Sequence, residues 1–479
     1  MSMEDSMSEV VYDVVILGAG PGGYVAAIRA AQLGLKVAVV EKDRAGGVCL
    51  NVGCIPSKSL IHQADLYAES LSFLAKAGVA VDTAGFSYEA VFKASRLASD
   101  RLSKGVQYLL KKNGVELVQG TGSVTDARHI LVKMADGERV LEGKALILAT
   151  GSRPRSIPGF EIDEGRFMSS TGMLMSPTLP KRLVILGAGA IGMEFAHITR
   201  SFGVEVTVVE LLDQVLPLED AETAAVVAKS FASRGIRILT STKAAGATAG
   251  PDGVAVSLTL PDGTATTVEA DRVLVSVGRA PNTDGIGLEK LGLTLTRGYI
   301  ETGDWFETQV AGVYAIGDIT TMPQLAHVAS KAGEIAVEHI ASLLKGTPEP
   351  AESRIGPYEI PAAVYCKPEV ASFGLQEKKA KERAVRHQVA RFPFRGVGKA
   401  VATEAPDGQV KLIFNPDSGA VLGASIVGAG ATDTIHELLL AARSELSVEE
   451  VADMIHAHPT LAEGVMEAAK AALGHAIHA

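Results

Sequence analysis

Cysteine is scarce in this chain, which has only Cys49, Cys54 and Cys366 among 479 residues. So few cysteines exclude a secreted scaffold held together by disulfides. Runs of basic residues are absent and the formal net charge is −10, which argues against nucleic acid or an anionic membrane as a partner. The longest apolar stretches are only as long as strands and are broken by glycine, so we expect no membrane-spanning helix.

The first ten residues also lack features that would direct the chain elsewhere. They contain neither a basic region nor an apolar core, so we expect no secretory signal, and their acidic character argues against a transit peptide. We interpret them as a frayed tail and predict a protein of the reducing cytoplasm. Apolar residues (47%) and glycines (50) are plentiful instead, and this composition is typical of α/β layers joined by tight turns. A chain of this length needs three or four domains.

The two nearest cysteines lie in residues 46–58, GGVCLNVGCIPSK. Pro56 suits the first turn of a helix, so we expect Cys54 to open one. The exposed N–H groups and the dipole there stabilise a thiolate, and we expect Cys54 to have the lower pKa of the pair. Cys49 is expected in the glycine-rich approach, where an incoming thiol could reach it. Redox chemistry is favoured over half a zinc site, for which only His62 is a nearby candidate, and over two inert buried thiols.

A dinucleotide fingerprint precedes the cysteines, in residues 14–41. An apolar strand leads into Gly18, Gly20 and Gly23, a helix of small residues follows, and a second strand ends at Glu41. The glycines allow a tight turn, close approach of a pyrophosphate and close packing of helix on strand, while the acid can bond a ribose hydroxyl.

The fingerprint occurs twice. Residues 183–210 align with residues 14–41 without a gap, so that Gly187, Gly189, Gly192 and Glu210 repeat the key positions. Residues 255–282 likewise parallel residues 130–154. Two dinucleotide-binding folds are favoured over one site plus a decayed copy, because both copies keep the whole fingerprint.

The remaining patterns predict further elements. Residues 59–113 are expected to be helical with an interruption near 78–85, strands are expected at 116–122, 130–134 and 145–150, and residues 307–318 predict a strand ending at Asp318. That acid could bond a ribityl or ribose hydroxyl, or could simply open a turn. A helix from Ala326 and a linker at 345–353 are followed by an α+β domain of about 125 residues, with strands at 362–366, 410–414 and 421–427 and helices at 432–443 and 448–455.

Near the C-terminus, residues 456–463 read HAHPTLAE. Pro459 disfavours helix at His458, so we expect His458 to end one helix and Glu463 to lie one turn into the next. A carboxylate that orients an imidazole forms a general acid–base pair. A histidine that caps a helix, or a partial metal site, are the alternatives.

Together these motifs resemble the dihydrolipoamide dehydrogenase family. The resemblance runs from about Val11 to the C-terminus and includes GAGPGG, GGVCLNVGCIPSK, GAGAIGME, VGRAPNT, VYAIGD, LAH and HAHPTLAE in the family's order. It implies two Rossmann-like domains and a C-terminal α+β dimerisation domain. The implied boundaries are 1–155 for an FAD domain, 156–278 for an NAD domain, 279–352 for a central domain and 353–479 for an interface domain.

The resemblance also implies roles for single residues. The FAD set is Gly18, Gly20, Gly23, Glu41, Lys42, Lys58, Gly122, Thr150, Gly151, Asp318, Ala326 and His327, with Lys58 paired to Glu194. The NAD set is Gly187, Gly189, Ala190, Ile191, Gly192, Glu194, Glu210 and Gly278. Cys49 and Cys54 are implied to form a redox disulfide, with Cys49 exchanging with substrate and Cys54 facing the flavin. His458 is implied to be the base, held by Glu463, and to act at the disulfide of the partner subunit. No metal is implied.

The implied activity is reoxidation of protein-bound dihydrolipoamide with reduction of NAD⁺. The partners would be a second copy of the chain and the lipoyl domains of acyltransferases or the H-protein, in 2-oxo acid dehydrogenase or glycine cleavage complexes, with a part in cell redox homeostasis. Glutathione reductase shares the cysteine and HPT motifs, whereas mercuric reductase needs a cysteine pair that this chain lacks after Cys366. A redox-silent flavoprotein scaffold is the alternative from another class. Val48 and Cys366 depart from residues common in the family, and we expect Cys366 to be a small packing residue.

Overall fold

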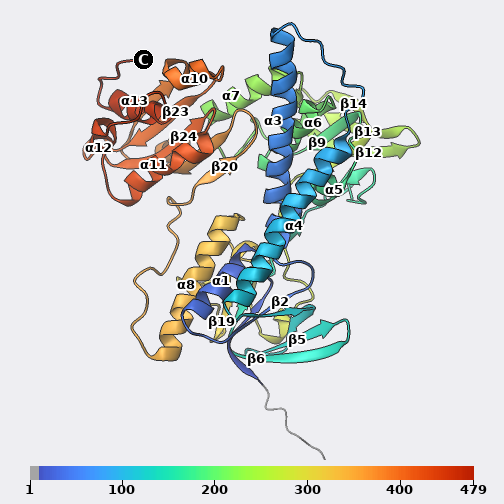
Figure 1. Ribbon diagram of the computed structural model, residues 1–479, viewed down its shortest axis with the longest axis vertical. Helices are drawn as coiled ribbons and strands as arrows, with labels where there is room; N and C mark the ends of the chain where they lie inside the picture. Colours follow the sequence, from blue (N-terminus) through green and yellow to red (C-terminus); the bar gives the residue numbers. More distant parts are fainter. Residues whose placement is uncertain (1–9, 479) are drawn as a thin grey trace, which may run out of the picture. The chain divides into compact units, whose positions relative to one another are not determined.

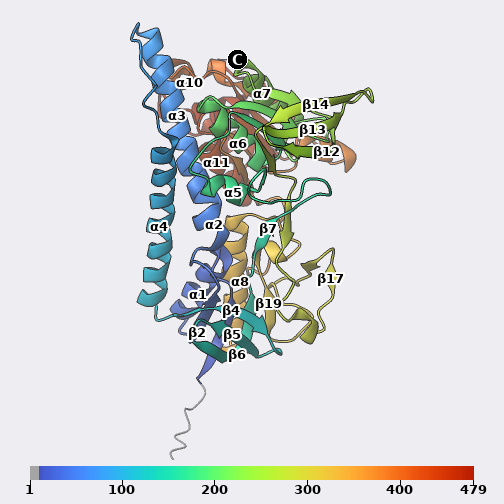
Figure 2. The same ribbon diagram turned by 90° about the vertical axis from the view of Figure 1, so that its right-hand side faces the viewer.

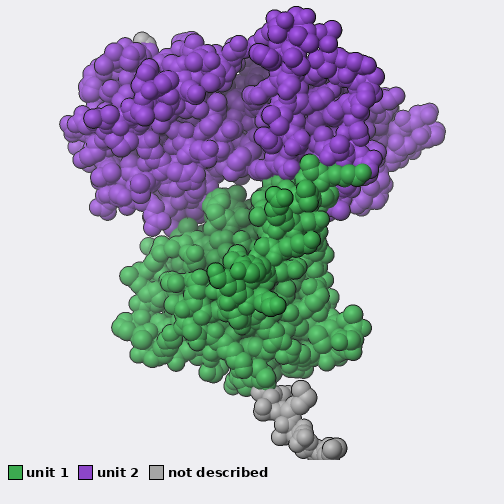
Figure 3. Space-filling model, in the orientation of Figure 1, with its two compact units in different colours: residues 1–57, 93–155, 278–355 green, residues 58–92, 156–277, 356–479 purple. Residues whose placement is uncertain are grey.

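The structure is a computed structural model that describes residues 10–478, so the predicted N-terminal tail lies outside the described residues except for its last residue. The chain divides into two compact units (Figure 3). Unit 1 comprises residues 1–57, 93–155 and 278–355, and unit 2 comprises residues 58–92, 156–277 and 356–479. Between residues 10 and 478, no helix is both long and apolar enough to cross a membrane.

Unit 1 is built on a seven-stranded sheet in the order β3-β2-β1-β6-β5-β4, with β19 also paired to β6. The strands are β1 (Val11–Leu17), β2 (Val37–Glu41), β3 (Glu116–Gln119), β4 (Thr121–Val124), β5 (His129–Met134), β6 (Gly137–Leu148) and β19 (Val313–Ala315). The first half of β6 pairs antiparallel with β5, and its second half pairs parallel with β1 and β19. Its apolar run is therefore continuous where both faces are covered, as expected of a buried parallel strand.

Helices α1 (Pro21–Gln32) and α8 (Ala326–Lys345) lie side by side in both ribbon views (Figures 1 and 2). Their alanines, among them Ala26, Ala30 and Ala336, pack with Val14 and Ile147 of the sheet in one buried cluster. Small side chains on both helices permit this close packing, and the cluster fixes the starts of α1 and α8 near the carboxyl ends of the parallel strands. Ligands bind at that edge in open α/β sheets.

Unit 2 contains a second parallel sheet that repeats the first. Its order is β11-β10-β9-β15-β8, which matches β3-β2-β1-β6-β19 strand for strand. The elements are β8 (Phe167–Met168), α5 (Ser170–Met175), β9 (Arg182–Leu186), α6 (Ala190–Ser201), β10 (Glu205–Val209), α7 (Ala221–Ser233), β11 (Arg237–Leu239) and β15 (Arg272–Val275). An antiparallel sheet of β12 (Lys243–Gly250), β13 (Gly253–Thr259) and β14 (Ala265–Ala270) repeats the meander formed by β4, β5 and β6. The predicted internal repeat is confirmed in three dimensions.

The C-terminal part of unit 2 is an antiparallel sheet in the order β20-β21-β24-β23-β22. Its elements are β20 (Ala362–Val364), β21 (Val370–Gly374), α9 (Glu377–Glu382), β22 (Gln388–Pro393), α10 (Gly398–Ala402), β23 (Gln409–Phe414), β24 (Val421–Val427), α11 (Ala431–Arg443), α12 (Val448–Asp453) and α13 (Glu463–Ala472). The predicted α+β character is confirmed, but β21 and β22 were not predicted. The sequence of β21, VASFG, is short and ends at a glycine with φ of +72°, so its strand character depends on pairing with β24.

The cysteine segment is more helical than predicted. The glycine-rich approach that carries Cys49 forms a short helix, α2 (Gly47–Val52), whereas Cys54 opens α3 (Cys54–Lys76) as expected. The predicted interruption separates α3 from α4 (Tyr88–Lys112). The expected strand at 307–318 is much shorter, because only Val313–Ala315 pairs with β6 and Asp318 falls in the 3₁₀ turn η2 (Gly317–Ile319).

Short elements complete unit 1. They are the ribbon of β7 (Ser152–Pro154) and β16 (Arg279–Pro281), the 3₁₀ turn η1 (Leu288–Lys290) and the hairpin of β17 (Leu295–Thr296) and β18 (Tyr299–Ile300). In unit 2, η3 (Phe394–Gly396) precedes α10. Cys366 is fully buried in unit 2, which agrees with its expected packing role.

Candidate functional site

The first glycine turn has the geometry that a bound pyrophosphate needs. Gly18 has φ of +107°, and a Cβ atom there would lie 2.3 Å from the Ala149 carbonyl oxygen. A Cβ on Gly23 would lie 1.8 Å from the Gly18 carbonyl oxygen, so glycine is required for α1 to pack on the turn. Around Gly20, by contrast, a Cβ would meet no atom within 4 Å, and no side chain caps α1. Open space therefore faces free N–H groups at the helix start, where anions bind.

The acid at the end of β2 is tied to the same turn. Glu41 is buried, its Oε2 accepts a hydrogen bond from the Ala19 N–H at 2.8 Å, and its Oε1 accepts one from the Asp43 N–H at 2.9 Å. Each carboxylate oxygen keeps a further lone pair for a hydroxyl group. The carboxylate is thus fixed beside the glycine turn before any ligand arrives.

Unit 2 repeats this arrangement bond for bond. Gly187 has φ of +96°, a Cβ on Gly192 would lie 2.0 Å from the Gly187 carbonyl oxygen, and the position of a Cβ on Gly189 is open. Glu210, also buried, accepts hydrogen bonds from the Ala188 N–H at 2.7 Å and the Leu212 N–H at 2.9 Å. Ala190 and Ile191 form the first turn of α6. Both turns are intact, which argues against a decayed copy.

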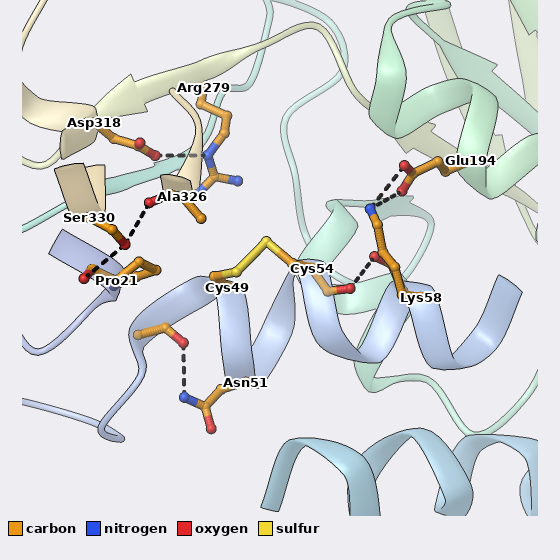
Figure 4. Close-up of a disulfide and its surroundings, with 12 residues drawn as sticks. Pro21, Cys49, Asn51, Cys54, Lys58, Glu194, Arg279, Asp318, Ala326 and Ser330 are labelled. Atoms are coloured by element: carbon orange, nitrogen blue, oxygen red, sulfur yellow. Dashed lines mark hydrogen bonds and ion pairs between the residues drawn. A yellow bond between two sulfur atoms is a disulfide. The ribbon is translucent and has the colours of Figure 1, made fainter. Parts of the chain in front are cut away.

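Cys49 and Cys54 form a disulfide that joins α2 to the start of α3 (Figure 4). The segment that carries it touches the first glycine turn, because the Gly46 N–H donates to the Ala19 carbonyl at 2.8 Å. A Cβ on Gly47 would lie only 2.7 Å from the Cα of Gly20. The disulfide therefore belongs to the same site as the N-terminal fingerprint.

The start of α8 reaches this region as well. Ser330 donates to the carbonyls of Ala326 at 3.0 Å and Pro21 at 3.5 Å, which ties α8 to α1 (Figure 4). Ala326 and His327 thus open a helix whose first turn lies beside that of α1. Of the other predicted residues in unit 1, Lys42 follows β2 directly and Gly122 lies in β4 against Leu17.

Asp318 is held by two residues that were not predicted. Its Oδ2 accepts a hydrogen bond from Ser152 Oγ at 2.5 Å, and Ser152 Oγ in turn accepts one from Arg279 Nε at 2.7 Å. Figure 4 shows the Arg279 guanidinium directed at Asp318, with Nε 4.0 Å from Oδ2. The motif VGRAPN contains this arginine, but nothing in the sequence indicated that it would reach across to Asp318.

Thr150 and Gly151 lie between β6 and β7, directly before Ser152. Thr150 Oγ1 donates to the Asn282 carbonyl at 2.8 Å, and the Asn282 side chain donates back to the Thr150 carbonyl at 3.0 Å. Gly151 and Gly278 have φ of +71° and +107°, and a Cβ on either would meet open space. Both positions therefore leave backbone uncovered by a side chain just after a strand.

The predicted pairing of Lys58 with Glu194 is present within unit 2. Lys58 Nζ lies 2.9 Å from both carboxylate oxygens of the buried Glu194. Tyr365 completes the cluster, since its N–H donates to Glu194 at 3.1 Å and its ring centroid lies 4.4 Å from Lys58 Nζ. Burial and the charge of Glu194 raise the pKa of Tyr365. Lys58 is thereby held in one position by a carboxylate and an aromatic face.

His458 and Glu463 also form the predicted pair. The residues between α12 and α13 are not helical, so His458 does not end a helix as expected, and Glu463 opens α13. His458 Nδ1 lies 2.9 Å from Glu463 Oε1, and the Thr460 N–H donates to Oε2 at 2.8 Å. Burial opposes ionisation of Glu463, but the bonds from Thr460 and His458 outweigh it and lower the pKa of that carboxyl. A carboxylate at Nδ1 keeps the proton there and leaves Nε2 able to accept one.

The imidazole of His458 is 75% exposed, unlike its carboxylate partner at 18%. The neighbouring His456 is instead held inside the fold, with Nε2 at 2.8 Å from Glu437 and Nδ1 at 3.0 Å from the Met454 carbonyl. The two histidines of the motif therefore have different surroundings, and they do not form a metal-binding pair. Among residues 10–478 there is no cluster of three or more His, Cys, Asp or Glu side chains that could hold a metal ion.

Comparison with known proteins shows the family to which the chain belongs. Residues 12–333 match the family model of pyridine nucleotide-disulphide oxidoreductases, and residues 360–469 match the dimerisation domain of the same family. The chain is 43% identical over 468 residues to a dihydrolipoyl dehydrogenase of Zymomonas mobilis, with 98% of this chain and 99% of the relative covered. It is also 43% identical over 468 residues to that of Bacillus subtilis, with 97% of each chain covered.

A similar solved structure is LpdA from Mycobacterium tuberculosis, with a TM-score of 0.87, 32% identity and coverage of 95% of this chain and 98% of that one. The fold, the two intact glycine turns and the cysteine pair all agree with these matches. The chain belongs to the pyridine nucleotide-disulphide oxidoreductase family.

Proposed function

We propose that this protein is a dihydrolipoyl dehydrogenase, which oxidises dihydrolipoyl groups to lipoyl groups and reduces NAD⁺. The observation that carries the proposal is the Cys49–Cys54 disulfide, placed at the start of α3 and in contact with a dinucleotide turn. Near-complete coverage of relatives with that activity supports it. A scaffold without redox chemistry would not need the disulfide, both intact turns and the His458–Glu463 pair together.

FAD fits the turn of unit 1. The open position at Gly20 and the uncapped start of α1 suit a pyrophosphate, Glu41 and Asp318 suit hydroxyl groups, and Lys42, Gly122, Thr150, Gly151, Ala326 and His327 would complete the site. Contact of the cysteine segment with this turn, within unit 1, favours FAD here. When bound, FAD supplies two-electron transfer between the cysteine pair and the nicotinamide. Lys58, fixed by Glu194, would place a positive charge near the flavin.

NAD fits the turn of unit 2. Gly189 leaves room for a pyrophosphate at the start of α6, and Glu210 is fixed to receive a ribose hydroxyl. Ala190, Ile191 and Glu194 lie on the first turns of α6, and Gly278 would offer backbone to the same ligand.

The dithiol reaction takes place at the disulfide. A substrate thiol loses its proton to His458 and attacks the Cys49 sulfur as a thiolate, the Cys49–Cys54 bond breaks, and Cys54 leaves as a thiolate. This thiolate is stabilised at the start of α3. The second substrate thiol then attacks the mixed disulfide and closes the lipoyl ring, and its proton passes to the released Cys49 sulfur. Two electrons have then passed from the substrate to the cysteine pair.

We further propose that His458 acts on the disulfide of a partner subunit in a homodimer. Its exposed imidazole in the single chain supports this, as does its location within the region that matches the dimerisation domain. Glu463 would hold the imidazole in the tautomer that accepts a proton at Nε2.

The wider setting is also a proposal. The substrates would be lipoyl domains of acyltransferases or of the H-protein, and the low number of cysteines supports a reducing cytoplasm. The four domains would have boundaries at residues 155, 278 and 352, so that unit 1 combines the FAD and central domains and unit 2 combines the NAD and interface domains. Residues 58–92 belong to unit 2, although they lie inside the proposed FAD domain.

Substrate preference tests the proposed function directly. NAD⁺ reduction by dihydrolipoamide should exceed that by glutathione by at least about a hundredfold in kcat/KM, because a linked dithiol completes the second exchange within one molecule. The assay uses the holoenzyme with each thiol at equal concentration of reducing equivalents. Comparable rates with glutathione would move the protein to the glutathione reductase branch.

Nucleotide preference is a separate prediction. The buried carboxylate of Glu210 is followed by the exposed Leu211 and Leu212, and no Lys or Arg occurs before Lys229. Two like charges about 4 Å apart repel by about 1 kcal/mol in water and by about 4 kcal/mol at an effective dielectric near 20. We therefore expect NAD⁺ to be preferred over NADP⁺ by about a hundredfold or more, which corresponds to about 2.7 kcal/mol.

The measurement is kcat/KM with each nucleotide for the wild type and for Glu210→Ala. Glu210→Ala should have a smaller preference for NAD⁺ over NADP⁺, chiefly because it loses the contact with the ribose and binds NAD⁺ more weakly. Glu205→Ala, at the exposed start of the same strand, is the matched control and should leave the preference unchanged. Equal rates with both nucleotides in the wild type would refute the assignment of Glu210.

A further inference from the structure

A polar stripe on α4 contacts the segment that carries Cys49. The stripe consists of Arg96, Asp100 and Ser103, which are spaced i, i+4 and i+7 and therefore share one face of the helix. All three lie in the part of α4 that belongs to unit 1, as does the cysteine segment. The sequence predicted only that this region is helical, and neither the dithiol reaction nor the two nucleotide sites use these residues.

Each member of the stripe contacts a different residue between Arg44 and Asn51, the stretch that leads into α2 and contains Cys49. Arg96 Nη1 donates to the Asn51 carbonyl at 2.7 Å, and Ser103 Oγ donates to the Ala45 carbonyl at 2.8 Å. Asp100 forms an ion pair with Arg44 at 2.6 Å. Ser103 is buried, and so is Ser99, whose hydroxyl accepts a bond from Arg96 Nη2 at 3.0 Å. The contacts reach both ends of the segment from Arg44 to Asn51.

Asn51 connects these contacts to α2, the helix that contains Cys49. The buried side-chain amide of Asn51 donates to the carbonyls of Gly47 at 2.9 Å and Ala45 at 3.2 Å, while the backbone carbonyl of Asn51 accepts a hydrogen bond from Arg96. Figure 4 shows the Asn51 side chain on the side of α2 away from the disulfide, so these bonds do not involve the sulfur atoms. The carbonyls in the last turn of a helix lack partners within the helix, and a cation there interacts favourably with the helix dipole.

We propose that the α4 stripe positions the redox pair, and that Arg96 is its principal positioning residue. In the oxidised state the disulfide itself joins α2 to α3. After two electrons and two protons convert it to two thiols, the direct bond between the sulfur atoms is gone, and their separation depends on the backbone between them and on noncovalent contacts. The stripe contacts α2 on the side away from the disulfide and so keeps the two reduced sulfur atoms at a high effective concentration relative to each other. This favours re-formation of the disulfide. The inference rests on the proposed redox role of the cysteine pair.

The test is the thiol–disulfide equilibrium of the holoenzyme in buffers of reduced and oxidised glutathione. Two molecules of glutathione supply the electrons and protons and become one glutathione disulfide, and the Cys49 and Cys54 thiols are counted by alkylation and mass spectrometry after acid quenching. In Arg96→Met the ratio of dithiol to disulfide should rise about tenfold at a given buffer, the scale of a lost hydrogen bond to a charged group. That change corresponds to a potential about 30 mV less negative. Arg96→Lys, which keeps the charge and a donor, should recover part of the difference.

Two further variants sharpen the result. Arg101→Met, at an exposed position on the same helix, should stay within about twofold of the wild type, since it removes an arginine away from the stripe. Ser103→Ala should shift the equilibrium in the same direction as Arg96→Met by about threefold, because it removes a neutral hydrogen bond. If Arg96→Met fails to fold, Ser103→Ala and Arg96→Lys decide the question.

The outcomes separate this inference from the proposed function. A wild-type pair that exchanges reversibly, together with Arg96→Met and Ser103→Ala ratios equal to that of Arg101→Met, would overturn the positioning role alone. A wild-type pair that does not exchange with glutathione or dihydrolipoamide at all would contradict the proposed function itself.

Discussion

Replacing Cys49 by serine is expected to reduce NAD⁺ reduction by dihydrolipoamide by at least about 10⁴-fold, the scale observed when an enzyme loses its covalent nucleophile. A hydroxyl group has nearly the same shape as a thiol but can neither form nor exchange a disulfide. Cys54→Ser should have an equally large effect, because the pair acts as a unit and either loss prevents ring closure of the substrate. Steady-state rates at saturating substrate provide the measurement.

The third cysteine provides a matched control. Cys366 is fully buried in unit 2, and burial raises the pKa of its thiol far above the range in which it could react. Cys366→Ala should therefore keep the rate within a few-fold of the wild type. FAD content after purification should be the same in all three variants, which separates loss of chemistry from loss of fold. Substantial activity in Cys49→Ser would exclude the disulfide from the reaction.

Replacing His458 by alanine is expected to lower the rate of dithiol oxidation by about 10²–10⁴-fold, the usual contribution of a general base. The variant leaves the cysteine pair and both glycine turns intact, so the effect should fall on kcat for dihydrolipoamide. His475→Ala, in the exposed C-terminal segment, should have no comparable effect. A rate for His458→Ala within about threefold of the wild type would show that another group removes the substrate proton.

Complementation tests where His458 acts. If it serves the disulfide of the partner subunit, heterodimers of His458→Ala and Cys49→Ser chains contain one site with both an intact base and an intact disulfide. Mixed dimers should then recover part of the activity that each homodimer lacks. Heterodimers that form, retain FAD and stay inactive would place the base and the disulfide in the same chain.

The features that sequence predicted well are local ones. The spacing of Gly18, Gly20 and Gly23 dictates a turn, because a Cβ at the first or third position would collide with backbone of the turn or of the strand beside it. The start of α3 at Cys54 follows from proline in its first turn. The internal alignment of residues 14–41 with 183–210 predicted a duplicated sheet, and the two strand orders agree.

The features that sequence missed depend on contacts between distant segments. Ser152 and Arg279 lie 127 positions apart, and only the pairing of β7 with β16 brings them together at Asp318. Arg96 reaches Asn51 because α4 packs against the cysteine segment, and its spacing with Asp100 and Ser103 resembles the polar face of any exposed helix. The helix around Cys49 was not predicted, because the sequence there, with glycines at 46, 47 and 53, was interpreted only as a glycine-rich approach to α3.

The most direct test of the redox role of the cysteine pair is to identify the thiols that one equivalent of dihydrolipoamide creates in the purified protein without oxygen. Alkylation and mass spectrometry after acid quenching should find new thiols at Cys49 and Cys54, with Cys366 unchanged, and addition of NAD⁺ before quenching should remove both. If dihydrolipoamide leaves the Cys49–Cys54 disulfide intact while NAD⁺ is still reduced, the electrons take another route and the disulfide is not the redox centre of this enzyme.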